Sequence, residues 1–183
     1  MKERPNLNEL AKEIHNDNKL KGFHDVDWSD EHCLMLAICE LCEAIEADRH
    51  SIRADIEGFN NNCNENDFED AYIDCIVGSI EEELADFVIR LLDLAGKKNI
   101  YITLPDGASY FDRHNIREKS FTEQLHQVVY DLMTISNNLN ETISIIIAQS
   151  EYICKLEDID LYTHIDLKLK YNKTRPYKHG KEY

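Results

Sequence analysis

The sequence predicts an all-α protein, a helical bundle of four to six helices, and three observations support this class. Apolar residues recur at spacings of three, four and seven along most of the chain, which is the period of an amphipathic helix. Polar residues suited to capping and glycines stand where these periodic stretches begin and end. The one strand-like run, residues 100–104, has no second strand with which to form a sheet.

The first helix is expected at residues 5–21, where Asn6 can cap the start and Gly22 follows the end. A loop containing the single tryptophan, Trp28, leads to a second helix at about 30–50. From Gly58 the chain has loop composition. A short helix is possible at 68–78, and a third long helix is expected at about 79–97.

The second half of the chain continues the helical pattern. After residues 100–104, Pro105-Asp106-Gly107 predicts a turn. Ser120 and Glu123 form a capping box that opens the next helix, which Asn137-Asn138 ends. Two further helices are expected at about 140–156 and 158–174, the last of them ending before Pro176.

Two of the expected helices carry acidic pairs on otherwise apolar surfaces. Glu40 and Glu43 are three residues apart, so on a helix their Cβ atoms lie about 5–6 Å from each other. Glu83 and Asp86 repeat this spacing on a helix that is apolar on most sides, and that helix is therefore expected to be buried with its acids turned inward. Side by side, the two helices would bring four carboxylates together, and such groups take up protons or gather around a cation. Oxygen ligands without His or Cys favour Mg²⁺ or Mn²⁺.

Basic residues offer an alternative to the metal site. Arg90 and Arg49 are available to pair with the acids, in which case the carboxylates would be structural. Glu46, one turn beyond Glu43, has two possible roles: a group that supports the metal site or accepts a proton from water, or an exposed residue at the helix end.

The C-terminal helix carries the basic region of an acidic protein. Lys168, Asn172 and Arg175 stand at positions i, i+4 and i+7, so they project from one face, and no acid lies between Asp166 and Glu182. Next to an acid cluster, these residues would supply donors for phosphate oxygens. The alternative is a solvated tail attracted generally to the acidic body.

These motifs together resemble a known family. The segments with Glu40 and Glu43, with Glu83 and Asp86, and with Lys168, Asn172 and Arg175 are similar to the ExxE, ExxD and KxxxNxxR motifs of the all-α MazG-like nucleotide pyrophosphohydrolases. The resemblance covers roughly residues 5–57, 79–96 and 158–181. It implies one MazG-like domain over residues 1–183, with insertions at about 58–78 and 97–120.

The resemblance also implies an activity. A (deoxy)nucleoside triphosphate would be hydrolysed to nucleoside monophosphate and pyrophosphate, as in nucleotide-pool house-cleaning, with Mg²⁺ held by the four acids and Mn²⁺ as a possible substitute. It implies a base pocket near the loop with Trp28, to which His15 and Asn18 are candidates to contribute. The same loop aromatics could instead form a lid that packs the end of the bundle. A homodimer or higher homo-oligomer is expected.

Three other functions stay open at this point. A phosphoribosyl-ATP pyrophosphohydrolase would use the same metal chemistry on another substrate. A non-catalytic nucleotide-binding helical module would bind nucleotides without cutting them. A purely structural bundle would show no effect of metal on its melting temperature.

The net charge and the hydropathy of the chain limit the classes of partner and the cellular location to be expected. The formal net charge of −16 at pH 7 argues against a nucleic-acid polymer or an anionic membrane, because each needs a basic surface. No apolar run approaches the roughly 20 residues that span a bilayer, and residues 1–5 lack the apolar segment of a signal peptide. We therefore expect a cytoplasmic protein whose six cysteines are reduced thiols.

Overall fold

The computed structural model describes residues 1–63, 68–105, 115–134, 138–180 and 182. Within these residues it contains eight α-helices and no strand, which confirms the expected all-α class. The α-helices are α1 (Leu7–Leu20), α2 (Asp30–Arg49), α3 (Ile56–Asn62), α4 (Phe68–Cys75), α5 (Ile80–Lys98), α7 (Phe121–Thr134), α8 (Leu139–Leu156) and α9 (Leu161–Thr174). Two short 3₁₀ turns are η2 (Ile116–Glu118) and η3 (Tyr177–Gly180).

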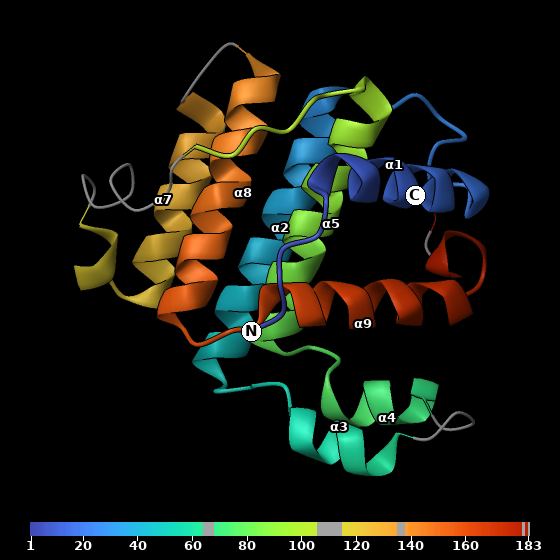
Figure 1. Cartoon of the computed structure of the whole chain (residues 1–183), viewed down its shortest axis with the longest axis vertical. Helices are drawn as coiled ribbons and strands as arrows, with labels where there is room; N and C mark the ends of the chain where they lie inside the picture. Colours follow the sequence, from blue (N-terminus) through green and yellow to red (C-terminus); the bar gives the residue numbers. More distant parts are fainter. Residues whose placement is uncertain (64–67, 106–114, 135–137, 181, 183) are drawn as a thin grey trace.

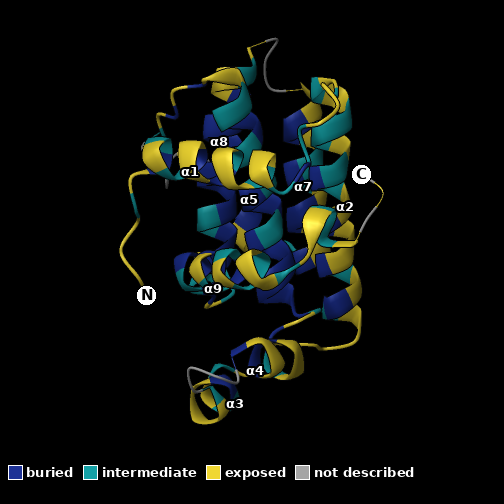
Figure 2. Ribbon diagram, turned by 90° about the vertical axis from the view of Figure 1, so that its right-hand side faces the viewer, coloured by how far each residue is buried: buried dark blue, intermediate teal, exposed yellow. Residues whose placement is uncertain are grey.

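Helix α5 is the centre of the molecule. It packs against α1, α2, α8 and α9, and the apolar positions on both sides of its polar stripe are buried, as the sequence predicts. In Figure 1, α2, α5, α7 and α8 run along the long axis, while α1 and α9 cross α5 at different heights. Figure 2 shows the buried residues concentrated on α5 and on the faces of the helices turned toward it. Six helices thus share one core.

Local capping signals set the starts of several helices. The side chain of Asn6 accepts hydrogen bonds from the backbone amides at the start of α1, and Ser29 and Ser79 do the same for α2 and α5. Ser120 and Glu123 form the expected capping box, in which the Ser120 amide donates to Glu123 Oε2 at 2.9 Å and the Glu123 amide donates to Ser120 Oγ at 3.4 Å. These contacts are local, so the sequence specifies them directly.

The stretch that begins near Gly58 differs from expectation, because α3 occupies the start of what looks like a polar loop. Asp55 caps this helix by accepting a hydrogen bond from the Gly58 amide at 2.8 Å. Phe59 of α3 is buried in a small cluster with Phe68 and Tyr72 of α4. The α3–α4 hairpin forms a separate unit at the end of the body near α9 (Figures 1 and 2). The expected loop was wrong here, because the Asp55 cap and the burial of Phe59 stabilise a helix despite its asparagines.

Residues 100–104 form no strand. The side chain of Asn8 takes the place of a strand partner: its Oδ1 accepts from the Ile102 amide at 2.7 Å, and its Nδ2 donates to the Ile102 carbonyl at 3.1 Å. Ile100 and Ile102 are both buried. In the expected turn after this run, Asp106 and Gly107 lie outside the described residues.

The last helix begins three residues later than expected. Asp158 takes a left-handed conformation, with φ of 56°, and this separates α8 from α9. The Ile159 amide then donates to the Cys154 carbonyl at 2.8 Å, which seats Ile159 in the core. None of the described helices combines the length and the apolar character needed to cross a membrane.

Candidate functional site

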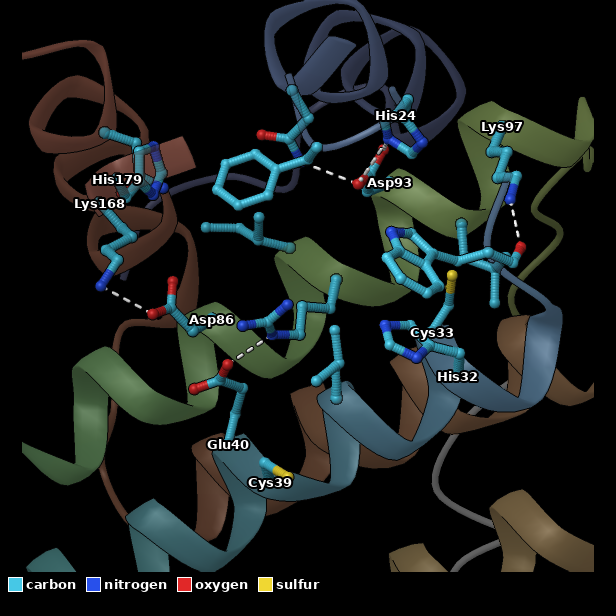
Figure 3. A pocket seen from close by; sticks show the side chains of 18 of the residues that line it. His24, His32, Cys33, Cys39, Glu40, Asp86, Asp93, Lys97, Lys168 and His179 are labelled. Carbon is cyan, nitrogen blue, oxygen red and sulfur yellow. Dashed lines mark hydrogen bonds and ion pairs between the residues drawn. The ribbon is translucent and has the colours of Figure 1, made fainter. Parts of the chain in front are cut away.

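A pocket of about 410 Å³ lies where α2, α5 and α9 meet the turn between α1 and α2. Acidic residues from α2 and α5 line one part of it, and aromatic residues of the 21–29 turn and the start of α2 line another. Figure 3 shows side chains from all of these elements pointing into one space. Lining residues with a charged or aromatic side chain include Phe23, Trp28, His32, Glu40, Glu43, Asp86, Arg90, Asp93, Lys97, Lys168 and Arg175.

Three of the four expected metal ligands form a tight group. Glu40, Glu43 and Glu83 each offer one carboxylate oxygen, and these oxygens all lie within 4.8 Å of one another. Glu40 and Glu83 are buried, whereas Glu43 is exposed. Burial, together with the negative charge of its acidic neighbours, raises the pKa of Glu83 to about 9. These three acids could therefore share a cation, which would remove the cost of crowding like charges.

Asp86 stands apart from this group because it is paired with a cation from α9. The Lys168 ammonium lies 2.7 Å from Asp86 Oδ2 and 2.6 Å from Glu82 Oε1. Burial alone would lower the pKa of Lys168, but attraction to Asp86 and Glu82 outweighs it and raises the pKa. The Tyr72 hydroxyl also donates to Glu82 Oε1, at 3.2 Å. Lys168 therefore lies between two carboxylates.

Arg90 supplies the second cation at the acidic end. Its Nε donates to Glu40 Oε1, and Figure 3 shows this contact on the wall of the pocket. Burial raises the pKa of the Glu40 carboxyl, and the positive charge of Arg90 opposes that rise. The sequence left open that a basic residue pairs with an acid of the cluster. Arg90 and Glu40 form such a pair.

Glu46 and Arg49 lie away from the pocket. Glu46 is exposed on the last turn of α2, where it accepts from Arg49 at 2.6 Å and contacts His50 Nε2 at 3.0 Å. Of the two positions considered for Glu46, the structure shows the exposed one. Arg49 consequently makes its ion pair with Glu46 and not with the carboxylate group.

The other two residues expected to bind phosphate, Asn172 and Arg175 at the end of α9, reach the pocket. Asn172 and Arg175 line it beside Lys168. Asn172 Oδ1 is buried and has no hydrogen-bond partner among the described residues. The Arg175 guanidinium lies 5.6 Å from the centre of the Tyr171 ring, and its Nη2 donates to the His179 carbonyl at 3.4 Å. The basic face of α9 therefore belongs to the pocket wall and is not a solvated tail.

The residues expected near a base lie at the other end. Trp28 lines the pocket and stacks on His32, with ring centres 4.3 Å apart and an angle of 12° between the planes. Asn18 also lines the pocket, and its Nδ2 donates to Asp93 Oδ2 at 2.9 Å. His15 contacts Asp93 but is not among the lining residues.

Two residues here, Asp93 and His24, are absent from the set expected from the sequence. Asp93 lies on the polar stripe of α5 at i+7 from Asp86, so the stripe was a usable signal. His24 Nε2 contacts Asp93 Oδ1 at 2.8 Å across 69 residues of sequence. Nothing in the local sequence indicates that contact.

Comparison of the chain with protein-family models, curated proteins and solved structures finds no significant match.

Proposed function

We propose that this protein is a cytoplasmic hydrolase that uses Mg²⁺ to cleave a (deoxy)nucleoside triphosphate into nucleoside monophosphate and pyrophosphate. The observation that carries the proposal is the group of oxygens from Glu40, Glu43 and Glu83, which lie within 4.8 Å of one another. Glu40 and Glu43 line the pocket. A volume of about 410 Å³ lies within the range of small-molecule sites.

The donor set fits a hard divalent cation. Mg²⁺ prefers oxygen ligands, binds through a few carboxylates and retains waters and substrate phosphates. Glu40, Glu43 and Glu83 would hold it, with Asp86 one helical turn from Glu83 as a further ligand if it leaves Lys168. When bound, Mg²⁺ would polarise the α-phosphate and lower the pKa of a coordinated water. Mn²⁺ has similar ligand preferences and could replace it.

The basic residues of the pocket suit a polyphosphate. Arg175 and Asn172 are placed to hold phosphate oxygens, because both line the pocket and both carry side-chain N–H donors. Lys168 is between Asp86 and Glu82, so its role in the proposal is to orient Asp86 and to offset the charge of the leaving pyrophosphate. Catalysis would be largely electrostatic.

The aromatic end suits a nucleobase. Trp28 and His32 stack with nearly parallel rings, and Phe23 lines the same pocket. A flat base could stack on such rings, while Asn18 would offer hydrogen bonds to its edge. The proposal therefore puts the base near the 21–29 turn and the phosphates between α5 and α9.

One observation favours a second candidate, a non-catalytic nucleotide-binding module. Arg90 already pairs with Glu40, and Lys168 with Asp86, so two of the four acids are neutralised without any metal. Such a module would bind nucleotides and leave the phosphates intact in the presence of Mg²⁺.

The deciding experiment measures pyrophosphate release from ribo- and deoxyribonucleoside triphosphates and from phosphoribosyl-ATP, with Mg²⁺ and then with EDTA. In ¹⁸O-labelled water, attack at the α-phosphate puts the label in the monophosphate. Glu83→Gln should abolish release, whereas Glu13→Gln, which removes an exposed acid of α1, should not change it. Quenching of Trp28 fluorescence by nucleotide without any release would support the binding module.

The proposal includes a homodimer or higher homo-oligomer. Sedimentation velocity of the purified protein measures this directly, with and without nucleotide. A monomer at all concentrations would remove the oligomer from the proposal and leave the chemistry unaffected.

A further inference from the structure

His15, His24 and Asp93 form a second cluster of potential metal ligands, and it differs chemically from the carboxylate group. His15 belongs to α1, His24 to the 21–29 turn and Asp93 to α5. One ligand atom from each lies within 4.8 Å of the other two. Figure 3 shows His24 and Asp93 directed at each other from different elements.

The distances within the cluster are close to those of a ligand set. His15 Nδ1 lies 3.0 Å from Asp93 Oδ1, and His24 Nε2 lies 2.8 Å from the same oxygen and 3.0 Å from Oδ2. Two donors bound to one ion at 2.0–2.1 Å stand roughly 3–3.4 Å apart, so an opening of a few tenths of an ångström would admit the ion.

The surroundings supply the other features of a metal site. Asn18 Nδ2 donates to Asp93 Oδ2 at 2.9 Å and so orients the carboxylate, as outer partners of metal ligands do. The side chains of the three ligands are 13–22% exposed, which shields them from bulk solvent without sealing them off. His24 and Asp93 line the pocket, so water or a substrate group could complete the coordination.

The ligand types select the ion. Two imidazoles with one carboxylate and open positions are typical of Zn²⁺ and of Fe²⁺-type sites, whereas Mg²⁺ prefers oxygen alone. An ion here would also link α1 and α5 to the turn that carries Trp28. We propose that His15, His24 and Asp93 bind one divalent transition-metal ion, through Nδ1 of His15 and Nε2 of His24. Binding of this ion does not require the nucleotide hydrolysis proposed above.

The test titrates Zn²⁺ into the full chain by calorimetry in excess Mg²⁺, with ¹⁵N spectra of the histidine rings as a second readout. We expect one zinc per chain, with metal-induced shifts at His15 Nδ1 and His24 Nε2. Asn18→Ala should weaken binding about 10–100-fold through loss of the outer partner. Binding should be lost in His24→Ala and in Asp93→Asn.

His50→Ala is the matched control, because His50 pairs with Glu46 on the exposed end of α2 and offers a similar His–carboxylate pair outside the pocket. This variant should bind zinc as the wild type does. The ring spectra of the wild type decide the question even if a pocket variant fails to fold. Zinc binding that leaves the ring nitrogens of His15 and His24 unshifted, or no zinc binding at all, would overturn the proposal.

Discussion

The buried Lys168 of α9 and the half-buried Asp86 of α5 form an ion pair, with the ammonium nitrogen 2.7 Å from Oδ2. The same nitrogen lies 2.6 Å from Glu82 Oε1. One cation therefore joins α9 to the acidic end of α5, and it does so at the wall of the candidate site. Fold stability and site geometry depend here on the same contact.

Lys168→Met should destabilise the protein strongly. The substitution leaves the buried Glu82 and the half-buried Asp86 without their cation, and breaking a buried pair such as Lys168–Glu82 costs about 3–5 kcal/mol. Urea unfolding followed by circular dichroism measures the loss. The control is Lys173→Met on the same helix, where an exposed ion pair with Asp17 at 3.7 Å should contribute less than about 1 kcal/mol. Equal losses in the two variants would argue against the importance of the buried pair.

Glu83→Gln and Asp86→Asn should affect the metal-free protein in opposite directions. The pKa of Glu83 is raised to about 9 by burial and by neighbouring acids, so the charged form opposes folding and Gln relieves it. Asp86→Asn instead removes a partner of Lys168. With EDTA at neutral pH, the Tm should rise by about 2–4 °C for Glu83→Gln, equivalent to about 1 kcal/mol, and fall for Asp86→Asn.

The raised pKa of Glu83 should make the stability of the metal-free protein depend on pH. Between the unfolded pKa, about 4.3, and the folded value of about 9, the folded state holds a proton that the unfolded state lacks. Stability from this group is therefore greatest below that window and is lost as the pH rises through it. Thermal melts in EDTA across this range should show a slope in the wild type that Glu83→Gln flattens. Identical profiles in the two proteins would contradict the raised pKa.

Gly22→Ala should release the C-terminal turn η3. Gly22 has φ of 85°, and a Cβ added there would overlap the ring of Tyr177, whose hydroxyl donates to Asp25. Gly78→Ala is the matched control, because Gly78 has φ of 76° but no atom within 4 Å of the added Cβ. The control should lose about 1–2 kcal/mol from backbone strain alone. Gly22→Ala should lose more and should be cut faster by trypsin after Lys178, while equal cleavage rates would show that Tyr177 does not hold the turn.

His164→Gln should make the protein less sensitive to mild acid. Burial lowers the pKa of His164 in α9, so the folded state favours the neutral ring while the unfolded ring protonates near pH 6.5. Stability from this group is thus present above about pH 6.5 and is lost as the pH falls below it. Urea unfolding at about pH 7.5 and pH 5.5 compares wild type with His164→Gln. Exposed His126→Gln is the control and should keep the wild-type difference.

Local signals were enough for most of the helices. Asn6 and Ser120 cap helices as expected, and Ser29 and Ser79 cap two more, because a cap joins residues only two or three positions apart. The burial of α5 follows from its apolar pattern for a similar reason. Helix α3 was missed because its formation depends on the packing of Phe59 against α4.

The candidate site likewise has one part that local spacing predicts and one part that depends on long-range contacts. The grouping of Glu40, Glu43 and Glu83 could be anticipated, since helical spacing puts each acid on a known face and two such faces then meet. The basic partners of the acids could not be anticipated from the sequence, because they come from distant segments of the chain. Lys168 reaches Glu82 across 86 residues and His24 reaches Asp93 across 69.

The sequence by itself determined the class of fold, the main helices and the faces that carry the acids, because these follow from the local period of the chain. Only the tertiary structure decided that Lys168 lies between Glu82 and Asp86, that Arg90 holds Glu40, and that two histidines converge on one carboxylate. Such pairings depend on the angles at which helices cross, and those angles are set by the packing of the whole core.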